Sequence, residues 1–259
     1  MVDSRFPSPG DITLQEFRDV LAKYDQLIEA VSASKGAKPG QKTLAELDHY
    51  RYVEAPALFA TTSSRRPMQL GDVQTLVEWK LKHGKFRPTL MKLVSSNEES
   101  FVKDTATSAL DIYTKKADAS AAIDVLTRLK GIGPATASLL LAVHDPQNIV
   151  FFADEAFYWL CNHGRRDHIK YNAKEYKQLH ENSQKLATRL NVRAMDVERV
   201  AYVLLNDSGA SPTTKPPAET PNSAAAPPEK TTSAATKKRQ EGAIEASSAP
   251  RRSKRRKPA

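Results

Sequence analysis

Apolar residues recur every three to four positions along most of residues 1–207, and no segment of useful length alternates apolar with polar residues. This spacing places apolar side chains on one face of a helix, whereas a half-buried strand requires alternation. In the first such segment the recurring residues are Leu14, Phe17, Val20, Leu21, Tyr24, Leu27, Ile28 and Val31. The spacing predicts an all-α fold of about ten helices, arranged as one compact domain or as two packed lobes.

Residues 208–259 differ from the preceding chain because they are rich in Pro, Ala, Ser and Thr and almost free of large apolar side chains. Such a segment buries too little apolar surface to offset the entropy lost on ordering. We therefore predict a folded helical domain over residues 1–207, followed by a disordered basic tail over residues 208–259.

The net charge of +9 is concentrated in this tail, which holds 11 Lys and Arg against 4 Asp and Glu and leaves 28 against 26 in residues 1–207. Two compact basic clusters separated by a flexible spacer are typical of a bipartite nuclear-import signal. The alternative is a solvated tail that associates with any polyanion. We expect nuclear localisation and a nuclear import receptor as partner. The cluster residues are Lys237, Lys238, Arg239, Arg251, Arg252, Lys254, Arg255, Arg256 and Lys257.

Several classes of protein are disfavoured by what the sequence lacks. Cys161 is the only cysteine, which excludes an intrachain disulfide and a cysteine-based metal cluster. The histidines show no metal-ligand spacing, and no apolar run is long enough for a signal-peptide core or a membrane span. We expect no metal, no cofactor and no association with membranes.

The segment "LKGIGPATASLLLAV" has the composition of a tight turn between two helices, within about residues 120–145. Gly131 can adopt the left-handed conformation that ends a helix, and Gly133 permits close approach of another backbone. Pro134 suits the first turn of the next helix. Free N–H groups at that helix start would form a small anion site that fits a DNA phosphate. The DNA-binding candidates here are Gly131, Ile132, Gly133 and Ala135.

The pattern Leu129, Gly131, Ile132, Gly133 and Ala137 resembles the helix–hairpin–helix motif. Asp154 follows Gly133 by 21 positions, at the start of a predicted helix. The helix–hairpin–helix DNA glycosylase superfamily places its catalytic aspartate at about this distance. The resemblance, which covers about residues 120–165, implies a compact multi-helix glycosylase-like domain with double-stranded DNA as partner. It also implies that Asp154 is the catalytic residue of a base excision repair enzyme.

Cleavage of an N-glycosidic bond creates positive charge on the sugar, and a nearby carboxylate stabilises that charge after the base has been flipped into a pocket. Family members that also cut the DNA backbone carry lysine where this chain has Ala135, and many members carry histidine where it has Ala156. The resemblance therefore implies a monofunctional glycosylase without a lyase lysine.

Two basic runs outside the glycine turn are further candidates for phosphate contacts. Lys85 and Arg87 lie in "WKLKHGKFRP", and Arg165 and Arg166 lie in "NHGRRDHIK". As charge runs alone, both are more typical of a solvated face. The aromatic residues between Phe151 and Trp159 are expected to lie mainly in the core, although some could stack on a flipped base.

A structural role for Asp154 competes with the catalytic one, because aspartate is also a good helix N-cap. The alternative function is a helix–hairpin–helix module that binds DNA or a protein partner and has lost the chemistry. A base-sized cavity beside the carboxylate distinguishes an enzyme from such a module, in which aromatic side chains would fill that space.

Overall fold

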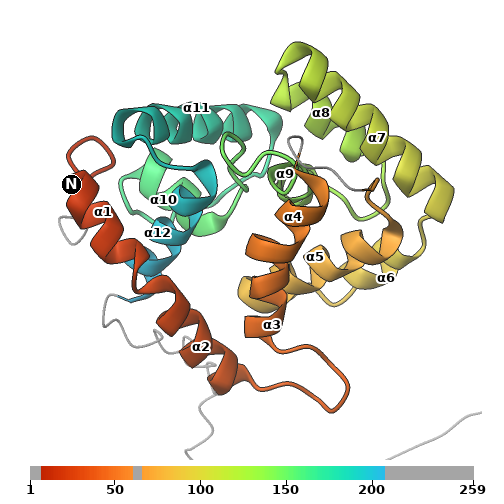
Figure 1. Ribbon diagram of the computed structural model, residues 1–259, viewed down its shortest axis with the longest axis horizontal. Helices are drawn as coiled ribbons and strands as arrows, with labels where there is room; N and C mark the ends of the chain where they lie inside the picture. The colour runs from red at the N-terminus through yellow and green to blue at the C-terminus, as the bar shows by residue number, and fades with distance from the viewer. Residues whose placement is uncertain (1–6, 61–65, 208–259) are drawn as a thin grey trace, which may run out of the picture. The chain divides into compact units, whose positions relative to one another are not determined.

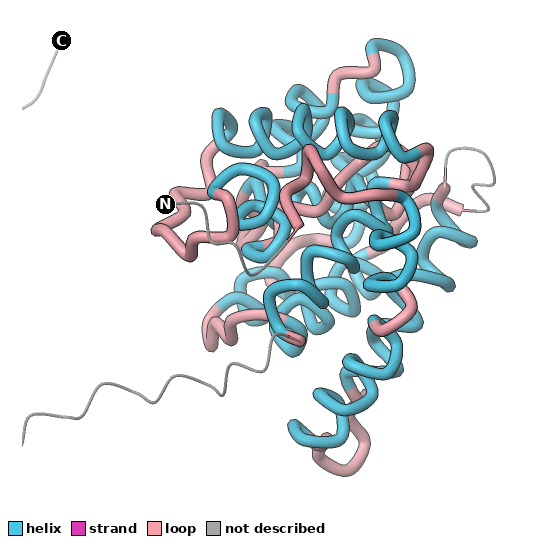
Figure 2. The backbone as a smooth tube through the Cα atoms, turned by 90° about the vertical axis from the view of Figure 1, so that its left-hand side faces the viewer, coloured by secondary structure: helices cyan, strands magenta, loops and turns pink. Residues whose placement is uncertain are grey.

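The computed structural model describes residues 7–60 and 66–207, and this part of the chain consists of helices and loops without any strand (Figure 2). The all-α class is therefore confirmed. The predicted tail and its basic clusters lie outside the described residues. The helices are α1 (Leu14–Leu21), α2 (Tyr24–Lys35), α3 (Leu44–His49), the π-helix η1 (Tyr50–Glu54), α4 (Ala55–Phe59), α5 (Leu70–His83), α6 (Leu90–Ser95), α7 (Glu99–Lys116), α8 (Ala119–Leu126), α9 (Pro134–Ala142), α10 (Asp154–Asn162), α11 (Ala173–Leu190) and α12 (Ala194–Asn206).

The described helices pack in two groups that continue into one core (Figure 1). The first group joins the two ends of this part of the chain, since α12 packs against α1, α2, α10 and α11. The second group contains the middle of the chain, where α5 contacts α3, α6 and α9, and α8 contacts α7 and α9. Between the groups, α2 contacts α3, and α11 contacts α9. The α8–α9 connection belongs to the second group and the start of α10 to the first, and residues of both line one pocket.

The segment from α3 to α4 follows one helical path although it contains Pro56. The N–H of Ala55 donates to the carbonyl of Tyr50, five residues back, so the path widens into a π-turn before the proline. Pro56 itself lies in the first turn of α4, where a missing N–H has little cost. The wide turn carries Arg51 and Tyr52 into the core.

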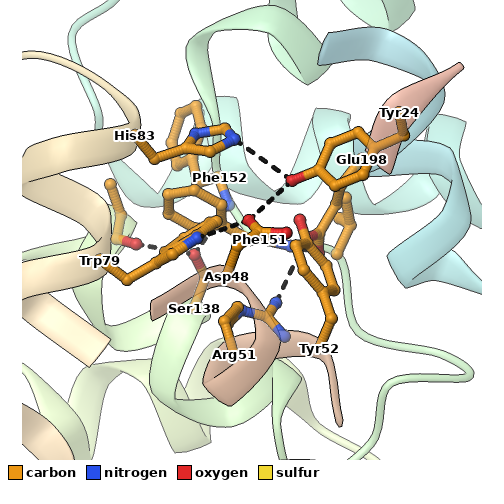
Figure 3. A network of polar contacts seen from close by, with 12 residues as sticks. Tyr24, Asp48, Arg51, Tyr52, Trp79, His83, Ser138, Phe151, Phe152 and Glu198 are labelled. Carbon is orange, nitrogen blue, oxygen red and sulfur yellow. Dashed lines mark hydrogen bonds and ion pairs between the residues drawn. The ribbon is translucent and has the colours of Figure 1, made fainter. Parts of the chain in front are cut away.

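A buried ion pair joins this π-turn to the last helix (Figure 3). Nη2 of Arg51 lies 3.2 Å from Oε2 of Glu198, and both side chains are almost completely buried. The hydroxyl of Tyr52 donates to the same oxygen, while Oε1 accepts from the backbone N–H of Phe151 at 2.5 Å. Burial raises the pKa of Glu198, although Arg51 favours its charged form. Glu198 thus anchors the segment that leads to Asp154.

A second set of buried polar contacts lies beside this pair (Figure 3). The carboxylate of Asp48 accepts hydrogen bonds from the hydroxyl of Tyr24 and from Nε1 of Trp79, at 2.9 and 2.8 Å. The imidazole of His83 stacks on Trp79 and lies against the ring of Tyr202, with centroids 4.1 Å apart. Its Nε2 lies 3.4 Å from the hydroxyl of Tyr24. These contacts hold the end of α5 in place against α12. Burial, together with Lys35 and Arg51, lowers the pKa of His83 to about 3.

We expect His83 to make the fold sensitive to mild acid. The folded state keeps His83 neutral, whereas the imidazole in the unfolded chain takes up a proton below its ordinary pKa of 6.5. The contribution of His83 to stability is therefore fully present above pH 6.5 and is lost as the pH falls. At pH 5 this amounts to about 2 kcal/mol. In urea unfolding, His83→Gln should be less stable than wild type at pH 7.5, and the gap should narrow by about that amount at pH 5. An equal gap at both pH values would contradict this assignment.

Candidate functional site

The connection between α8 and α9 is a tight turn held by a side chain from outside it. Helix α8 ends at Leu126, so Gly131 does not cap it as the sequence indicates; the glycine instead shapes the turn itself, with φ +78°. The side chain of Asn97 donates to the carbonyl of Lys130 and accepts from its N–H, at 3.0 and 2.8 Å. The turn is therefore fixed before any ligand arrives.

Three backbone N–H groups of this turn, those of Gly131, Gly133 and Ala135, donate to no acceptor within residues 7–60 and 66–207. Gly133 is exposed, Gly131 is half-buried and Ala135 is buried. They lie at the N-terminal end of α9, where the helix dipole favours negative charge. A Cβ added to Gly133 would meet nothing within 4 Å, so the approach to this turn is open.

The two glycines provide a matched test of this turn. Gly131→Ala should lose about 2 kcal/mol of stability, since the residue has positive φ and its new Cβ would lie 3.0 Å from Leu93 and 3.2 Å from the N of Val94. Gly133→Ala should stay within about 0.5 kcal/mol of wild type. It should nevertheless weaken binding of duplex DNA on the order of fivefold, because the new Cβ projects into the open space that a phosphate must enter to reach the N–H groups of the turn. Thermal unfolding and a DNA titration separate these outcomes; unchanged DNA affinity in Gly133→Ala would contradict the anion site.

Asp154 is placed by a short extended segment rather than by a helix cap. The N–H of Phe151 donates to Glu198, and the N–H of Phe152 donates to the buried Oγ of Ser138 at 2.9 Å. The N-cap of α10 is Ala153, and no side chain caps the helix. The alternative in which Asp154 caps α10 is therefore wrong, and its carboxylate is available for other contacts.

Both oxygens of the Asp154 carboxylate have partners from distant segments. Oδ1 accepts a 2.6 Å hydrogen bond from the hydroxyl of Tyr171, and Oδ2 lies 2.9 Å from Nζ of Lys85. Tyr171 adopts positive φ, +53°, an uncommon conformation for an aromatic residue and one often found at functional sites. The carboxylate is 22% exposed, and the Lys85 side chain is 70% exposed. The Lys85 side chain can therefore move away from Asp154 without disturbing the packing of the fold.

A pocket of about 460 Å³ opens beside this carboxylate. This volume lies in the range of small-molecule binding sites. Phe151 and Phe152 form apolar parts of the wall, and both belong to the core, as the sequence indicates. The complete lining is Lys80, His83, Gly84, Lys85, Arg87, Leu90, Gly131, Gly133, Pro134, Ala135, Thr136, Phe151, Phe152, Ala153, Asp154, Glu155 and Tyr171.

The pocket combines cations, carboxylates and free N–H groups on apolar walls. Burial raises the pKa of Glu155, which adjoins Asp154. Burial and the neighbouring Arg87 lower the pKa of Lys80 to about 8, against the opposing effect of Asp154. Such a site can hold a flat apolar group, stabilise developing positive charge and bind a phosphate at its rim.

The structure brings together six of the nine candidates at the pocket and leaves the other three outside its lining. Lys85 and Arg87 line the pocket with the turn, and Arg87 also lies 6.0 Å from the ring centre of Tyr171. Ile132 is buried and anchors the turn. Arg165 pairs with Asp167, and Arg166 donates to the carbonyl of Leu205. Neither of these two arginines lines the pocket. The six candidates brought together are Asp154, Lys85, Arg87, Gly131, Gly133 and Ala135.

Sequence reasoning missed Tyr171 and the role of Lys80. Lys80 stands in a basic run that is typical of a solvated face, and only its neighbours across the pocket distinguish it. No sequence signal points to Tyr171, because its contact with Asp154 depends on the path of the loop after α10. Among the described residues, no cluster of His, Cys, Asp or Glu could hold a metal ion, and no helix could cross a membrane.

Comparisons with protein-family models, with curated proteins and with solved structures find no match. The function of this chain is therefore inferred from the geometry of the pocket.

Proposed function

We propose that this chain is a DNA glycosylase-like enzyme of the helix–hairpin–helix type, which hydrolyses the N-glycosidic bond of a flipped nucleotide. The observation that supports this most strongly is the pocket, because it places a carboxylate beside a base-sized cavity and next to a turn with free N–H groups. This is the feature that separates an enzyme from a binding module with a filled site.

In the proposed mechanism the turn holds the phosphate next to the target nucleotide, while the base enters the pocket between apolar walls. Tyr171 orients the Asp154 carboxylate through its hydroxyl. As the bond to the base breaks, Asp154 stabilises the positive charge that develops on the sugar and orients the attacking water. Lys85, which is largely exposed, moves from Asp154 to a DNA phosphate.

The loop after α5 supports a duplex as the partner. Phe86 is 74% exposed and lies between Lys85 and Arg87, two residues of the pocket wall. An exposed aromatic side chain between two cations is suited to enter a base stack while its neighbours contact the backbone. This arrangement would fill the space that a flipped base leaves.

A second candidate is a binding module without chemistry. Both oxygens of Asp154 already have partners in the absence of DNA, as expected for a carboxylate with a structural role. Such a module would bind damaged DNA through the same turn but would release no base.

Binding and excision assays with the full chain test both candidates. We expect a duplex with a tetrahydrofuran abasic analogue to bind on the order of tenfold more tightly than plain duplex, since it removes the cost of unstacking the base. The basic tail is present in both titrations, so the difference between the two affinities reports on the folded domain. Release of a base from a panel of damaged duplexes supports the enzyme, and preference without release supports the module. Equal affinity for both duplexes would contradict both.

We also propose that residues 208–259 direct the protein to the nucleus. Fused to a reporter too large to diffuse through nuclear pores, the full chain should accumulate in nuclei. Replacing the nine Lys and Arg of the two clusters by Gln should abolish this accumulation, whereas reordering the Pro, Ala, Ser and Thr residues between them should not. Undiminished nuclear accumulation after the Gln replacement would exclude the import signal.

A further inference from the structure

Lys80 occupies an unusual position for a lysine. It lies near the end of α5, and its Nζ reaches across to the first turn of α9, where it donates a 2.7 Å hydrogen bond to Oγ1 of Thr136. The same Nζ lies 5.8 Å from the ring centre of Phe151. Lys80 is thus only partly exposed, and it lines the pocket that also holds Asp154.

The polar and charged groups around Lys80 come from three elements. Arg87 and Lys85 line the pocket from the loop after α5, Asp154 and Glu155 line it from α10, and Thr136 is the uncharged contact from α9. Burial and Arg87 lower the pKa of Lys80 to about 8. The Lys80 amine is therefore neutral in about half of the molecules at pH 8. In contrast, Asp154 raises the pKa of Lys85 and keeps that side chain protonated. Only a neutral amine is a nucleophile.

The proposed hydrolysis supplies an electrophile in the same pocket. When an N-glycosidic bond is hydrolysed, C1′ of the deoxyribose becomes a hemiacetal, which opens to an aldehyde. An aldehyde and a neutral amine condense to an imine, as in other lysine-dependent reactions of carbonyl compounds. The pocket would hold both partners after base release.

We propose that Lys80 forms an imine with the C1′ aldehyde of an abasic nucleotide bound in this pocket, and so gives the enzyme a second, strand-cutting activity. This inference rests on the proposed function. The resemblance implies no lyase, since position 135 is alanine, but the structure supplies an amine from another helix that reaches the neighbouring residue, Thr136.

The atoms and electrons of the step balance without an oxidant or a reductant. The lone pair of Nζ adds to C1′. The carbonyl oxygen takes up one proton from Nζ and one from solvent and leaves as water, which gives a protonated imine. The carboxylate of Asp154 removes a proton from C2′. The electron pair of that C–H bond forms the C2′–C3′ double bond, and the 3′ phosphate leaves. Water then hydrolyses the imine and restores the amine.

Reductive trapping tests this proposal with the full chain. Duplex DNA containing an aldehydic abasic site, made by excision of uracil, is incubated with the protein and sodium cyanoborohydride. We expect a covalent complex whose DNA-bearing peptide contains Lys80, and a trapping rate that rises through about pH 8. Lys80→Arg should reduce trapping on the order of a hundredfold. Lys82→Arg, on the same helix but paired with Glu78, should trap like wild type.

Other results would overturn the proposal. Trapping by Lys80→Arg at the wild-type rate, or an adduct on another residue, excludes Lys80 as the nucleophile. The mapping uses the wild-type chain, so its result does not depend on whether the variant folds. Tight binding of the tetrahydrofuran analogue without any trapping rejects this inference and leaves the proposed function intact, because the analogue cannot form an imine. Equal affinity for plain and analogue duplexes rejects both.

Discussion

Asp154→Asn is expected to lower the rate of base excision on the order of 10²- to 10³-fold, because the variant loses the negative charge that stabilises the oxocarbenium-like transition state. The amide has the shape of the carboxylate and still accepts from Tyr171. The ion pair with Lys85 is lost, but Lys85 is largely exposed, so stability should change by less than about 1 kcal/mol.

Single-turnover excision and titration with the tetrahydrofuran analogue separate chemistry from binding in this experiment. Asp154→Asn should bind the analogue at least as tightly as wild type, since removing a negative charge favours approach of DNA. Asp167→Asn, an exposed aspartate in the loop after α10, serves as control and should leave both quantities unchanged. Excision by Asp154→Asn at the wild-type rate would show that another group provides the chemistry.

The largest effect on stability is expected at the buried ion pair. Glu198→Gln leaves the Arg51 guanidinium buried without its counter-charge, which should cost about 3–5 kcal/mol. Nε and Nη1 of Arg51 have no hydrogen-bond partner among the described residues. After the substitution, the charge is offset only in part, by the rings of Tyr52 and Trp79 and by the nearby carboxylate of Asp48. For a domain of this size the loss should lower the midpoint of thermal unfolding on the order of 10 °C.

An exposed pair of the same charge type provides the control for this measurement. Lys115 and Asp111 lie one helical turn apart on α7, and both side chains are more than half exposed. Asp111→Asn should therefore change the free energy of unfolding by less than about 0.5 kcal/mol. A similar small change in Glu198→Gln would show that water reaches Arg51. Glu198→Gln keeps only one of the two oxygens that contact Arg51 and the N–H of Phe151, so one of these contacts is lost. The segment before Asp154 should shift as a result, and excision should fall in parallel.

The fold class followed from the sequence because its signals are local. The spacing of apolar residues determines which residues share a helix face, and it does so without knowledge of the partner helices. The glycine turn was predictable for the same reason, since positive φ at Gly131 and a proline at the start of α9 are properties of adjacent residues. The early end of α8 was not, because Asn97 from a distant segment holds the turn.

The candidate site was predictable only where one residue carried the signal. The spacing between Gly133 and Asp154 indicated the carboxylate, but its competing role as a helix cap could be dismissed only when Ala153 was found in the cap position. Tyr171 and Lys80 approach Asp154 and Thr136 from segments 17 and 56 residues away. The sequence alone thus determined the helices, the turn and the candidate carboxylate, and the tertiary structure decided which side chains enclose it. Periodicity acts between neighbours along the chain, whereas a pocket is made by packing between segments that the chain itself keeps apart.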